Sequence, residues 1–574
     1  MEHLSEQELL RRQSLNEIRS KGINPYPPEA VEVSHSTAEI LESFTEKNAD
    51  SFQSICISGR LMGKRIMGKA SFAELQDQSG RIQLYFNRDA ICPDEDKWKY
   101  NDFFKKLIDR GDFIAVWGHV FKTQVGETSV HVRDFQLLSK SLRPLPFPKT
   151  DESGKTYDAF TDPEQRYRQR YVDLVINPQV RDTFVKRTRI IDTMRRYFNS
   201  FGYLEVDTPI LQPIPGGASA RPFITHHNAL NMPLYLRIAN ELYLKRLIVG
   251  GFQGVYEFAR NFRNEGMDRT HNPEFTIMEI YVAYRDYQWM MDFTERMIEK
   301  IALEVNGTTD VEIEGKKISL AAPYRRLPML EAIREYAGVD VSGMDEQALR
   351  EVCKELKIDT DPSMGKAKLI DEIFGEKCEP QLIQPTFITD YPVEMSPLCK
   401  KHRDNPELTE RFELIINGKE LANAYTELND PIDQRERFEE QLKLSQKGDD
   451  EAMFIDHDFL RALEYGMPPT AGMGIGIDRL VMLLTANVSI QEVLLFPQMR
   501  PEKKMAAASP DDFVAIGIPQ EWASHVIAAG YSSVDGLRKE KHTVVHQKLN
   551  GFRKKNKLDI PALQLEEVKS WMEA

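Results

Sequence analysis

The sequence contains few cysteines and no long apolar stretch. Five cysteines occur among 574 residues, at positions 56, 92, 353, 378 and 399, and no pair of them has the spacing of zinc ligands. An odd, scattered set of this kind is typical of proteins from a reducing cytosol. No apolar run approaches the roughly 20 residues that a membrane-spanning helix needs, and the charged N-terminal stretch does not resemble a signal peptide. We therefore expect a cytoplasmic protein with no membrane partner.

The chain also lacks an excess of positive charge. Lys and Arg number 75 against 89 Asp and Glu, which gives a net charge of -14 and a pI near 5.5. This balance argues against indiscriminate nucleic-acid binding but leaves room for a local basic groove. The hydrophobic content of 41% and the charged content of 29% indicate a globular protein, and the length predicts about three or four domains.

Residues 1–50 are predicted to form an N-terminal helical segment and a linker. The helix is expected over residues 4–21, and a Pro-rich stretch follows it. Its basic side is open to two interpretations, which are contact with RNA phosphates and simple packing or capping. The apolar residues expected on this helix are Leu9, Leu10, Leu15 and Ile18.

Residues 51–145 show the pattern of a small β-barrel. Five short strands separated by turns, with one helical segment at 96–108, fit a Greek-key barrel of the OB type. The stretch from Arg60 to Lys69 has four basic residues and no acidic one, and Phe72 follows it. Basic groups beside an aromatic side chain can hold single-stranded bases, although lysines on a strand can also serve only to protect a sheet edge. Both interpretations remain open from the pattern alone.

A larger domain is predicted over residues 166–500, after a Pro-rich linker at 146–165. A long amphipathic helix lies near its start, because apolar residues between Phe184 and Phe201 recur at helical spacing. A small helical insertion is expected at about 335–385, and we find no chemistry in its residues.

The stretch Glu257–Tyr284 is predicted to form a strand, a charged loop and a second strand. Residues two apart on a strand share a face, so Glu279 and Tyr281 point together while Met278 points the other way. A carboxylate and a phenol on one face, beside an arginine-rich turn, indicate a polar site for a small charged molecule. Taken alone, the same pattern also fits a solvent-exposed hairpin.

A second hairpin is predicted over residues 410–429, where an Asn-Gly pair separates two apolar runs. A two-residue turn pairs Ile415 with Glu420 and Glu413 with Ala422. The two carboxylates then lie diagonally on one face, about 7–8 Å apart at Cα, and can close on one metal ion.

The same hairpin is predicted to contain a β-bulge. Asn423, Tyr425 and Glu427 alternate on one face of the second strand. Glu420, the metal-site carboxylate on that strand, is an odd number of residues away from them and would point to the opposite face of a regular strand. Both groups reach one site only if an extra residue interrupts the pairing. We therefore expect a bulge near Leu421 or Ala422.

Glycines and charged residues mark three further positions. Gly217 lies in a loop whose backbone amides could approach an anion, although a plain loop has the same composition. Glu241 lies in the first turn of a predicted helix, where the helix dipole alone would favour it. Gly474 is the middle of three glycines that alternate on a strand, which predicts close approach by another group. Arg479 follows at the start of the next helix.

Three of these elements, in this order, resemble the signature motifs of class II aminoacyl-tRNA synthetases. They are a basic helix with a strand that ends in Pro209, a strand that leads through Arg263 and a charged loop to Phe275, and the glycine strand before Arg479. A preceding OB-type barrel resembles the subgroup for lysine, aspartate and asparagine. Roughly residues 1–500 resemble the bacterial-type lysyl-tRNA synthetases, through the stretches IMGKASF, ARPFITHHNAL, RNFRNEG, HNPEFT, TELND and GMGIGIDR.

The resemblance implies a multidomain fold and an enzyme that activates lysine with ATP and charges the 3′ end of a tRNA. The implied fold is an all-β OB-type barrel followed by an α+β domain with an antiparallel sheet. A homodimer and Mg²⁺ are also implied. The implied catalytic residues are Arg263 and Arg479, and the implied metal ligands are Glu413 and Glu420. The residues implied to bind ATP are Arg263, Glu265, His271, Asn272, Phe275 and Arg479. Those implied to bind lysine are Gly217, Glu241, Glu279, Tyr281, Asn423, Tyr425, Glu427 and Gly474. Those implied to read the anticodon are Arg65, Phe72 and Gln83.

The choice of lysine follows from the acidic residues in this set. Carboxylates suit the α-amino and ε-ammonium groups of lysine, and pairing them lowers the cost of desolvation. An enzyme for aspartate or asparagine would not place so many carboxylates around the side chain of its substrate.

The C-terminal extension, residues 501–574, departs from the family pattern, in which the core ends near Pro497. It is predicted to be helical, and part of it resembles small helix-hairpin-helix modules. Residues 538–557 contain eight Lys and Arg and one Glu. A nucleic-acid contact and a solvated helical appendage both remain open for this stretch.

Two other functions are compatible with parts of the sequence. A ligase that attaches lysine to a protein would share the synthetase domain, but such relatives lack the anticodon-binding barrel. A non-catalytic RNA-binding paralogue is expected to lose the motif arginines or the metal carboxylates, and all four of these residues are present here.

Overall fold

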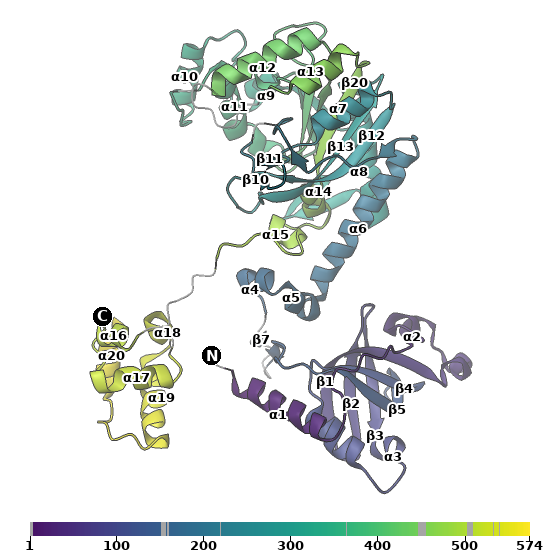
Figure 1. The fold of residues 1–574 in the computed structure, drawn as a ribbon, viewed down its shortest axis with the longest axis vertical. Coiled ribbons are helices and arrows are strands. Elements are labelled where there is room, and N and C mark those ends of the chain that lie inside the picture. The colour runs from purple at the N-terminus through teal and green to yellow at the C-terminus, as the bar shows by residue number, and fades with distance from the viewer. Residues whose placement is uncertain are drawn as a thin grey trace. The chain divides into compact units, whose positions relative to one another are not determined.

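We describe the fold from a computed structural model of the chain (Figure 1). The structure describes residues 4–150, 156–157, 160–218, 220–362, 364–445, 455–501, 509–531, 533–538 and 540–573. The chain divides into two compact units, Met1–Pro497 and Gln498–Ala574. Across the described ranges, we find no helix that combines the length and the apolar character needed to cross a bilayer.

Five strands close the predicted barrel in the order β1-β2-β3-β5-β4. Buried and half-buried residues alternate along β2 and β3, so one side of each strand fills the interior. The helical segment expected at 96–108 is present as η2 (Lys99–Leu107), which buries aromatic side chains against the barrel core. The OB-type barrel is therefore confirmed. Its strands are β1 (Ile55–Met67), β2 (Ala70–Gln76), β3 (Arg81–Asn87), β4 (Phe113–Lys122) and β5 (Thr128–Ser139).

The N-terminal helix buries two of its four expected apolar residues, Leu15 and Ile18. Helix α1 (Glu6–Ser20) is present, but Leu9 and Leu10, which were expected in its apolar face, are 49% and 54% exposed. Arg11 is buried instead, and its guanidinium donates to two backbone carbonyls at 2.8 and 3.0 Å. These acceptors lie about a hundred residues or more away in sequence, so helical spacing alone could not have indicated them.

An eight-stranded sheet forms the larger domain, in the order β16-β17-β18-β19-β20-β13-β12-β8. Its central strands are antiparallel, as predicted, and only the pairs β16–β17 and β12–β8 at the two ends are parallel. The strands are β8 (Leu204–Glu205), β12 (Gly254–Phe262), β13 (Glu274–Ala283), β16 (Arg325–Pro328), β17 (Thr386–Thr389), β18 (Arg411–Ile415), β19 (Glu420–Thr426) and β20 (Thr470–Gly476).

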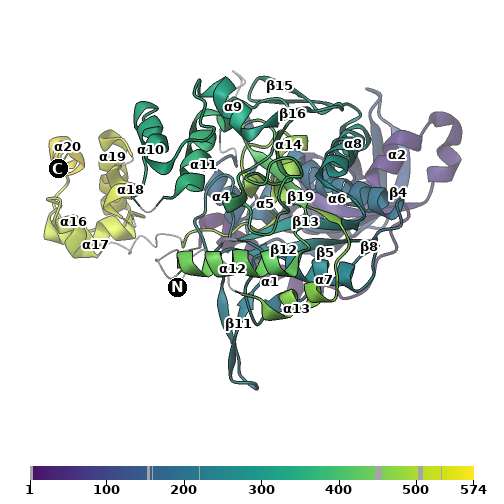
Figure 2. The ribbon, with the colours of Figure 1, turned by 90° about the horizontal axis from the view of Figure 1, so that it is seen from above.

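Helices cover both faces of this sheet, as Figure 2 shows. Met278, Ile280 and Val282 of β13 point into the main core together with α6, α8 and α14. The opposite face packs against α7, α12 and α13, and Tyr281 lies on this side. The predicted alternation along β13 is therefore confirmed. The helices are α6 (Pro178–Asn199), α7 (Glu241–Val249), α8 (Tyr287–Asn306), α12 (Pro431–Ser445), α13 (His457–Glu464) and α14 (Ile477–Leu484).

The helical insertion expected at about 335–385 contains two helices and part of a third. Together with β16 and β17 they bury a separate apolar cluster, so the segment has a core of its own. These helices are α9 (Met329–Tyr336), α10 (Glu346–Glu355) and α11 (Lys366–Lys377). The remaining elements of the first unit are α2 (Thr37–Ser43), η1 (Glu46–Phe52), α3 (Arg88–Ile91), β6 (Lys149–Thr150), β7 (Thr156–Tyr157), α4 (Pro163–Arg168), α5 (Arg170–Ile176), β9 (Leu211–Gln212), β10 (Ile224–His227), β11 (Met232–Leu236), β14 (Asp310–Ile313), β15 (Lys316–Ser319), η3 (Glu379–Gln381), η4 (Val393–Met395) and α15 (Ile490–Val493).

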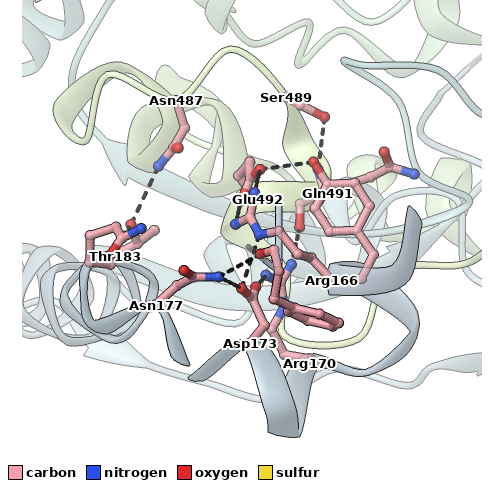
Figure 3. Close-up of polar contacts among 12 residues, drawn as sticks. Arg166, Arg170, Asp173, Asn177, Thr183, Asn487, Ser489, Gln491 and Glu492 are labelled. Carbon is pink, nitrogen blue, oxygen red and sulfur yellow. Dashed lines mark hydrogen bonds and ion pairs between the residues drawn. The ribbon is translucent and has the colours of Figure 1, made fainter. Parts of the chain in front are cut away.

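A buried polar network joins α4 and α5 to α15 (Figure 3). The Glu492 carboxylate accepts two hydrogen bonds from the Arg166 guanidinium, both at 2.9 Å, and one from the Tyr167 hydroxyl at 2.9 Å. Arg170 and Asp173 are completely buried and form an ion pair of 2.5 Å. Arg170 also donates to backbone carbonyls of α15 and the residues around it. This network fixes the position of α15.

The C-terminal unit is helical, as predicted. Its helices enclose an apolar core of their own, in which Trp522 and Trp571 are among the largest buried side chains. The helices are α16 (Pro510–Val514), α17 (Gln520–Ala528), α18 (Val534–Arg538), α19 (His542–Lys555) and α20 (Leu565–Glu573).

Candidate active site

A cavity of about 590 Å³ lies against β13, β19 and β20 on the α7 side of the sheet. It brings together almost all residues that the sequence indicated for ATP, lysine and metal. Glu427 is the exception, because it does not line the cavity. The predicted residues in the lining are Gly217, Glu241, Arg263, Glu265, His271, Asn272, Phe275, Glu279, Tyr281, Glu413, Glu420, Asn423, Tyr425, Gly474 and Arg479.

One end of the cavity is acidic. Glu241 and Glu279 are both buried, at 5% and 4% exposed. The Tyr281 hydroxyl donates to Glu279 Oε2 at 3.0 Å, and the Tyr425 hydroxyl donates to Glu241 Oε1 at 2.7 Å. The two phenols therefore hold the carboxylates in position and leave further carboxylate lone pairs for a cationic ligand.

Behind this end lies a buried ion pair that the sequence did not indicate. The Lys245 ammonium is fully buried, donates to Glu241 Oε1 at 2.6 Å and contacts the carboxylate of Glu427. Glu241 and Lys245 are four residues apart on α7, a spacing at which opposite charges meet on one helix face. Glu427 therefore belongs to the acidic group, but it occupies the layer behind the cavity wall.

The close packing of Glu427 explains one of the alternating glycines. A Cβ atom at Gly472 would lie 2.0 Å from Glu427 Oε1 and 2.5 Å from the Tyr281 ring. Only glycine fits there, as the sequence pattern predicted for this strand. Gly217 adopts a left-handed conformation with φ +86°, and a Cβ atom there would lie 3.3 Å from the Cβ of Glu241. Both glycines therefore allow the acidic end to form.

The acidic end retains a proton near neutral pH. Burial raises the pKa of Glu279 to about 8, and the Glu241 carboxylate adds to this rise. Burial likewise raises the pKa of Glu427. For Lys245, burial lowers the pKa, but Glu241 and Glu427 outweigh burial, so that its pKa is raised and it stays an ammonium. One ammonium thus faces three carboxylates, and a bound cation would complete the neutralisation.

The other end of the cavity is basic and aromatic. The Arg263 guanidinium lies 5.2 Å from the centre of the Phe275 ring. Its Nε is buried and has no hydrogen-bond partner among the described residues. A buried donor of this kind is costly unless a ligand satisfies it. The arrangement therefore suits a phosphate at the guanidinium and a planar base at the aromatic ring.

The charged loop that connects β12 and β13 is organised by one carboxylate. Asp268 Oδ1 accepts from the backbone N–H of Thr270 at 2.6 Å and of His271 at 2.8 Å, and Asp268 Oδ2 lies 2.9 Å from His271 Nδ1. The His271 side chain and these N–H groups outweigh burial and hold the pKa of Asp268 well below its ordinary value. His271 Nε2 lies 3.4 Å from a guanidinium nitrogen of Arg479. The loop is also anchored to α15, because Ile490 N–H donates to a loop carbonyl at 2.7 Å.

Two residues implied for ATP lie in or beside the same loop. Glu265 is exposed and lines the cavity. Asn272 donates from its side chain to the Glu274 carbonyl at 2.5 Å. Arg479 completes this end, and its guanidinium donates to the Glu420 carbonyl oxygen at 2.6 Å.

The hairpin of β18 and β19 contains the predicted bulge. Ile415 pairs with Glu420, as expected, but the register shifts before the next pair, and Leu421 is the extra residue. Glu413 consequently pairs with Asn423 and not with Ala422, so that part of the expected register was wrong. The shift moves Asn423 and the residues that alternate with it onto the face of the two carboxylates.

Glu413 and Glu420 form a donor set that fits Mg²⁺. Both line the cavity, and magnesium in proteins is bound through one or two carboxylates together with substrate phosphates. Burial raises the pKa of Glu413 to about 7, and the Glu420 carboxylate adds to the rise. The two carboxylates therefore lack enough neighbouring positive charge to balance them. Arg411 partly compensates, because it lies 2.5 Å from Glu413 Oε1. Among the described residues, no group of three or more His, Cys, Asp or Glu could hold a metal ion.

The residues implied for the anticodon lie together on the barrel. Arg65 on β1 pairs directly with Phe72 on β2, so their side chains share a face. Phe72 lies 5.2 Å from Tyr85, which lies 5.2 Å from His131. These rings are half-buried, and Gln83 lies on the same side of β3 as Tyr85. The barrel therefore presents an aromatic face with a basic and an amide side chain.

Two site residues escaped the sequence reasoning. Lys245 follows Glu241 by four positions within an apolar helix, and this Glu-Lys spacing was a usable signal. Arg411 precedes Glu413 by two positions on one strand, so both had to share a face. Lys245 is a buried cation and Arg411 a half-buried one, and each lies beside a candidate ligand-binding carboxylate.

Two family models match the chain. Residues 162–500 match the tRNA synthetases class II (D, K and N), and residues 55–138 match an OB-fold nucleic acid binding domain. The first model covers more than half of the chain and includes the whole cavity described above.

Curated relatives agree with these models. A lysine--tRNA ligase from Porphyromonas gingivalis is 63% identical over 571 residues, which cover 100% of this chain and 99% of the relative. One from Christiangramia forsetii is 67% identical over 512 residues, 89% of each chain. One from Azobacteroides pseudotrichonymphae is 64% identical over 500 residues, 87% of this chain and 99% of the relative. The chain therefore belongs to the lysine--tRNA ligase family of class II tRNA synthetases.

Proposed function

We propose that this chain activates lysine with ATP and transfers the lysyl group to tRNA. The observation that carries the proposal is the division of one cavity into an acidic end and a basic end. Glu241 and Glu279 line the first, and Arg263 and Arg479 line the second. A substrate with two ammonium groups and a substrate with a polyphosphate chain suit these ends.

Lysine binds at the acidic end. Its ammonium groups are neutralised by Glu241 and Glu279, while Glu427 acts from behind the wall. Tyr281 and Tyr425 orient the carboxylates by hydrogen bonds. Backbone groups at Gly217 and Gly474, and the amide of Asn423, complete the lining.

ATP binds at the basic end. Arg263 holds the α-phosphate, and Arg479 holds the terminal phosphate of a bent ATP molecule. Phe275 stacks on the adenine, and Glu265, His271 and Asn272 hold the base and phosphates from the loop. Mg²⁺ on Glu413 and Glu420 neutralises phosphate oxygens when it is bound.

The reaction needs no nucleophilic side chain. A carboxylate oxygen of lysine attacks the α-phosphorus of ATP, the bond to pyrophosphate breaks, and lysyl-adenylate forms. A hydroxyl at the tRNA 3′ end then attacks the lysyl carbonyl, and AMP leaves. Arg263 stabilises the charge that develops on the α-phosphate, so the side chains contribute positioning and electrostatics.

The barrel binds the anticodon of the tRNA. Phe72 stacks on a base, and Arg65 and Gln83 contact the neighbouring nucleotides. A barrel with this face favours tRNA over a protein as the lysine acceptor.

The active form is a homodimer in a reducing cytoplasm. Seven large apolar side chains between Phe201 and Leu230 are exposed, which is unusual for a monomer and suits a subunit interface. All five cysteines are free and buried. Light scattering on the purified chain gives the subunit number.

Charging of tRNA with labelled lysine tests the function. The purified chain with ATP, Mg²⁺ and tRNA is expected to convert lysine into an acid-precipitable, base-labile product. Incorporation that requires an added protein in place of tRNA would instead support a protein-lysine ligase. Absence of any lysine incorporation would contradict the proposal.

A further inference from the structure

The C-terminal unit differs in charge from the rest of the chain. Residues 498–574 carry twelve Lys and Arg against ten Asp and Glu, while the whole chain has a net charge of -14. The charges are also separated within the unit. Eight of the twelve basic residues lie between Arg538 and Lys557, where Glu540 is the only acid. One segment of the unit is therefore strongly basic.

Helix α19 carries four of these eight basic residues and contains no Asp or Glu. Lys541, Lys548 and Lys555 are spaced seven residues apart, which is two helical turns, so they form one stripe with a repeat of about 10.5 Å. All three are exposed. Lys548 lies 4.1 Å from the centre of the Tyr531 ring and 3.7 Å from Glu540, which positions its ammonium.

A glycine lies on the same exposed face of α19. Gly551 is in the interior of the helix, where glycine is less stable than alanine. A Cβ atom there would meet nothing within 4 Å, so packing within the unit does not require glycine. An unexplained glycine between two lysines suits a partner whose surface comes close to the helix backbone.

The exposed face of α19 offers charge and little apolar area. Val544 and Leu565 are the exposed large apolar side chains in the described part of this unit. A protein partner would need an apolar interface core with aromatic anchors, which this face lacks. A phosphate backbone needs only regularly placed cations and close approach.

We infer that the exposed face of α19 binds the phosphate backbone of RNA, and that its occupant is the tRNA that the enzyme charges. This inference rests on the proposed function. The contacts are made to phosphates, so binding does not depend on base sequence. The unit thus adds affinity for tRNA to that of the anticodon-binding barrel, because a second contact on the same chain acts at high effective concentration.

A relative supports an added rather than an essential role. The Azobacteroides protein matches this chain over 500 residues, which is 99% of its own length but 87% of this chain. A stretch about as long as the C-terminal unit therefore has no counterpart in it. The Porphyromonas relative matches the full length of the chain.

The test compares tRNA binding by the full chain and by three variants across a series of salt concentrations. The first is Lys541→Gln/Lys548→Gln/Lys555→Gln, which removes the stripe. The control, Lys316→Gln/Lys317→Gln/Lys569→Gln, removes the same charge from exposed lysines elsewhere. The third is Gly551→Gln, which adds a good helix former on the face that approaches RNA.

The stripe variant is expected to bind tRNA at least tenfold more weakly at 0.1 M salt, with a salt slope smaller by about two to three. The control keeps both the affinity and the slope. Gly551→Gln is expected to raise the melting temperature of the unit and yet weaken tRNA binding, an outcome that a purely structural glycine would not give. Unchanged affinity and slope in the stripe variant would overturn the inference. A stripe variant that binds tRNA as the unmodified chain does but has a different hydrodynamic radius would also overturn the inference. That result would indicate that the stripe docks on an acidic surface of the protein itself.

Lysine-dependent ATP–pyrophosphate exchange separates this inference from the proposed function. The exchange does not involve tRNA, so it is expected to be unchanged in all three variants. Loss of tRNA affinity with intact exchange supports the inference. Absence of exchange in the unmodified chain would contradict the proposed function, and tRNA binding would still decide the role of α19.

Discussion

The ammonium group of Lys245 contacts the carboxylate of Glu427, and both side chains are completely shielded from solvent. Lys245 also donates to Glu241, which lines the cavity, so it joins a carboxylate in the wall to one behind the wall. Without Lys245 the acidic end would hold three carboxylates and no cation. The pair therefore prepares the site for a cationic substrate, because Lys245 counters the rise that burial causes in the pKa of Glu427 and still leaves more carboxylates than cations.

Replacing Lys245 by Met is expected to raise the KM for lysine by at least about tenfold, because Glu427 then loses the cation that counters the rise of its pKa on burial and takes up a proton. The KM for ATP is expected to change little, since ATP binds at the other end. The pH profile of the lysine KM checks the mechanism, and it should shift to higher pH in the variant. A variant that folds and keeps the lysine KM and its pH profile would contradict this role.

Glu279 gives a pH-dependent prediction. Its pKa of about 8 in the folded protein is above the ordinary value of 4.5, so between these values only the folded chain holds the proton. Stability contributed by this proton is present below pH 4.5 and is lost as pH rises toward 8. Glu279→Gln is therefore expected to raise the melting temperature, and by more at pH 8 than at pH 6.

The same substitution is expected to weaken lysine binding. Affinity of the unmodified protein for lysine should increase from pH 7 to pH 8.5 as Glu279 ionises, and the variant should lose most of this increase. Calorimetric titration at several pH values measures both. Equal pH dependence in the two proteins would exclude Glu279 as the titrating group.

Phe72 gives a prediction for the barrel. Phe72→Ala is expected to lower the efficiency of tRNA charging by about tenfold or more, because base stacking on an aromatic ring contributes about 1–3 kcal/mol. Exchange of pyrophosphate into ATP should be unaffected, because that step does not need tRNA. Phe113→Ala, at a barrel aromatic that lies away from the Phe72–Tyr85 contact, is the matched control. Equal charging by the two variants would remove Phe72 from the RNA surface.

The network in Figure 3 gives a prediction of stability. Asp173→Ala leaves the buried Arg170 guanidinium without its carboxylate, and loss of one partner of a buried pair costs about 3–5 kcal/mol. The melting temperature of the first unit should fall by several degrees. Asp182→Ala, at an exposed position on α6, should leave it unchanged. Thermal unfolding followed by circular dichroism makes the comparison.

Much of the site was predictable because period-two patterns fix which residues share a strand face. Glu279 and Tyr281 had to point together, and the parity conflict between Glu420 and Asn423 required the bulge at Leu421. These inferences used only local geometry. The partner of Glu413 beyond the bulge did not follow from the strand pattern, because it depends on which residue is the extra one.

Long-range burial was not predictable in the same way. Leu9 and Leu10 were expected in the apolar face of α1 with Leu15 and Ile18, but only the last two are buried. Arg11 is buried as well, because its guanidinium donates to backbone carbonyls from another part of the chain. The sequence also placed Glu427 in the substrate pocket, whereas the structure places it one layer behind, against Lys245. In both cases the partner of a buried charged side chain, Arg11 or Glu427, comes from a segment distant in sequence.

The amino-acid dependence of ATP–pyrophosphate exchange tests the central claim most directly. The purified chain, with ATP, Mg²⁺ and each of the twenty amino acids in turn, is expected to give exchange with lysine well above every other amino acid. Glu427→Gln should keep this preference but raise the lysine KM about tenfold. Exchange that depends on aspartate or asparagine in place of lysine would contradict the account.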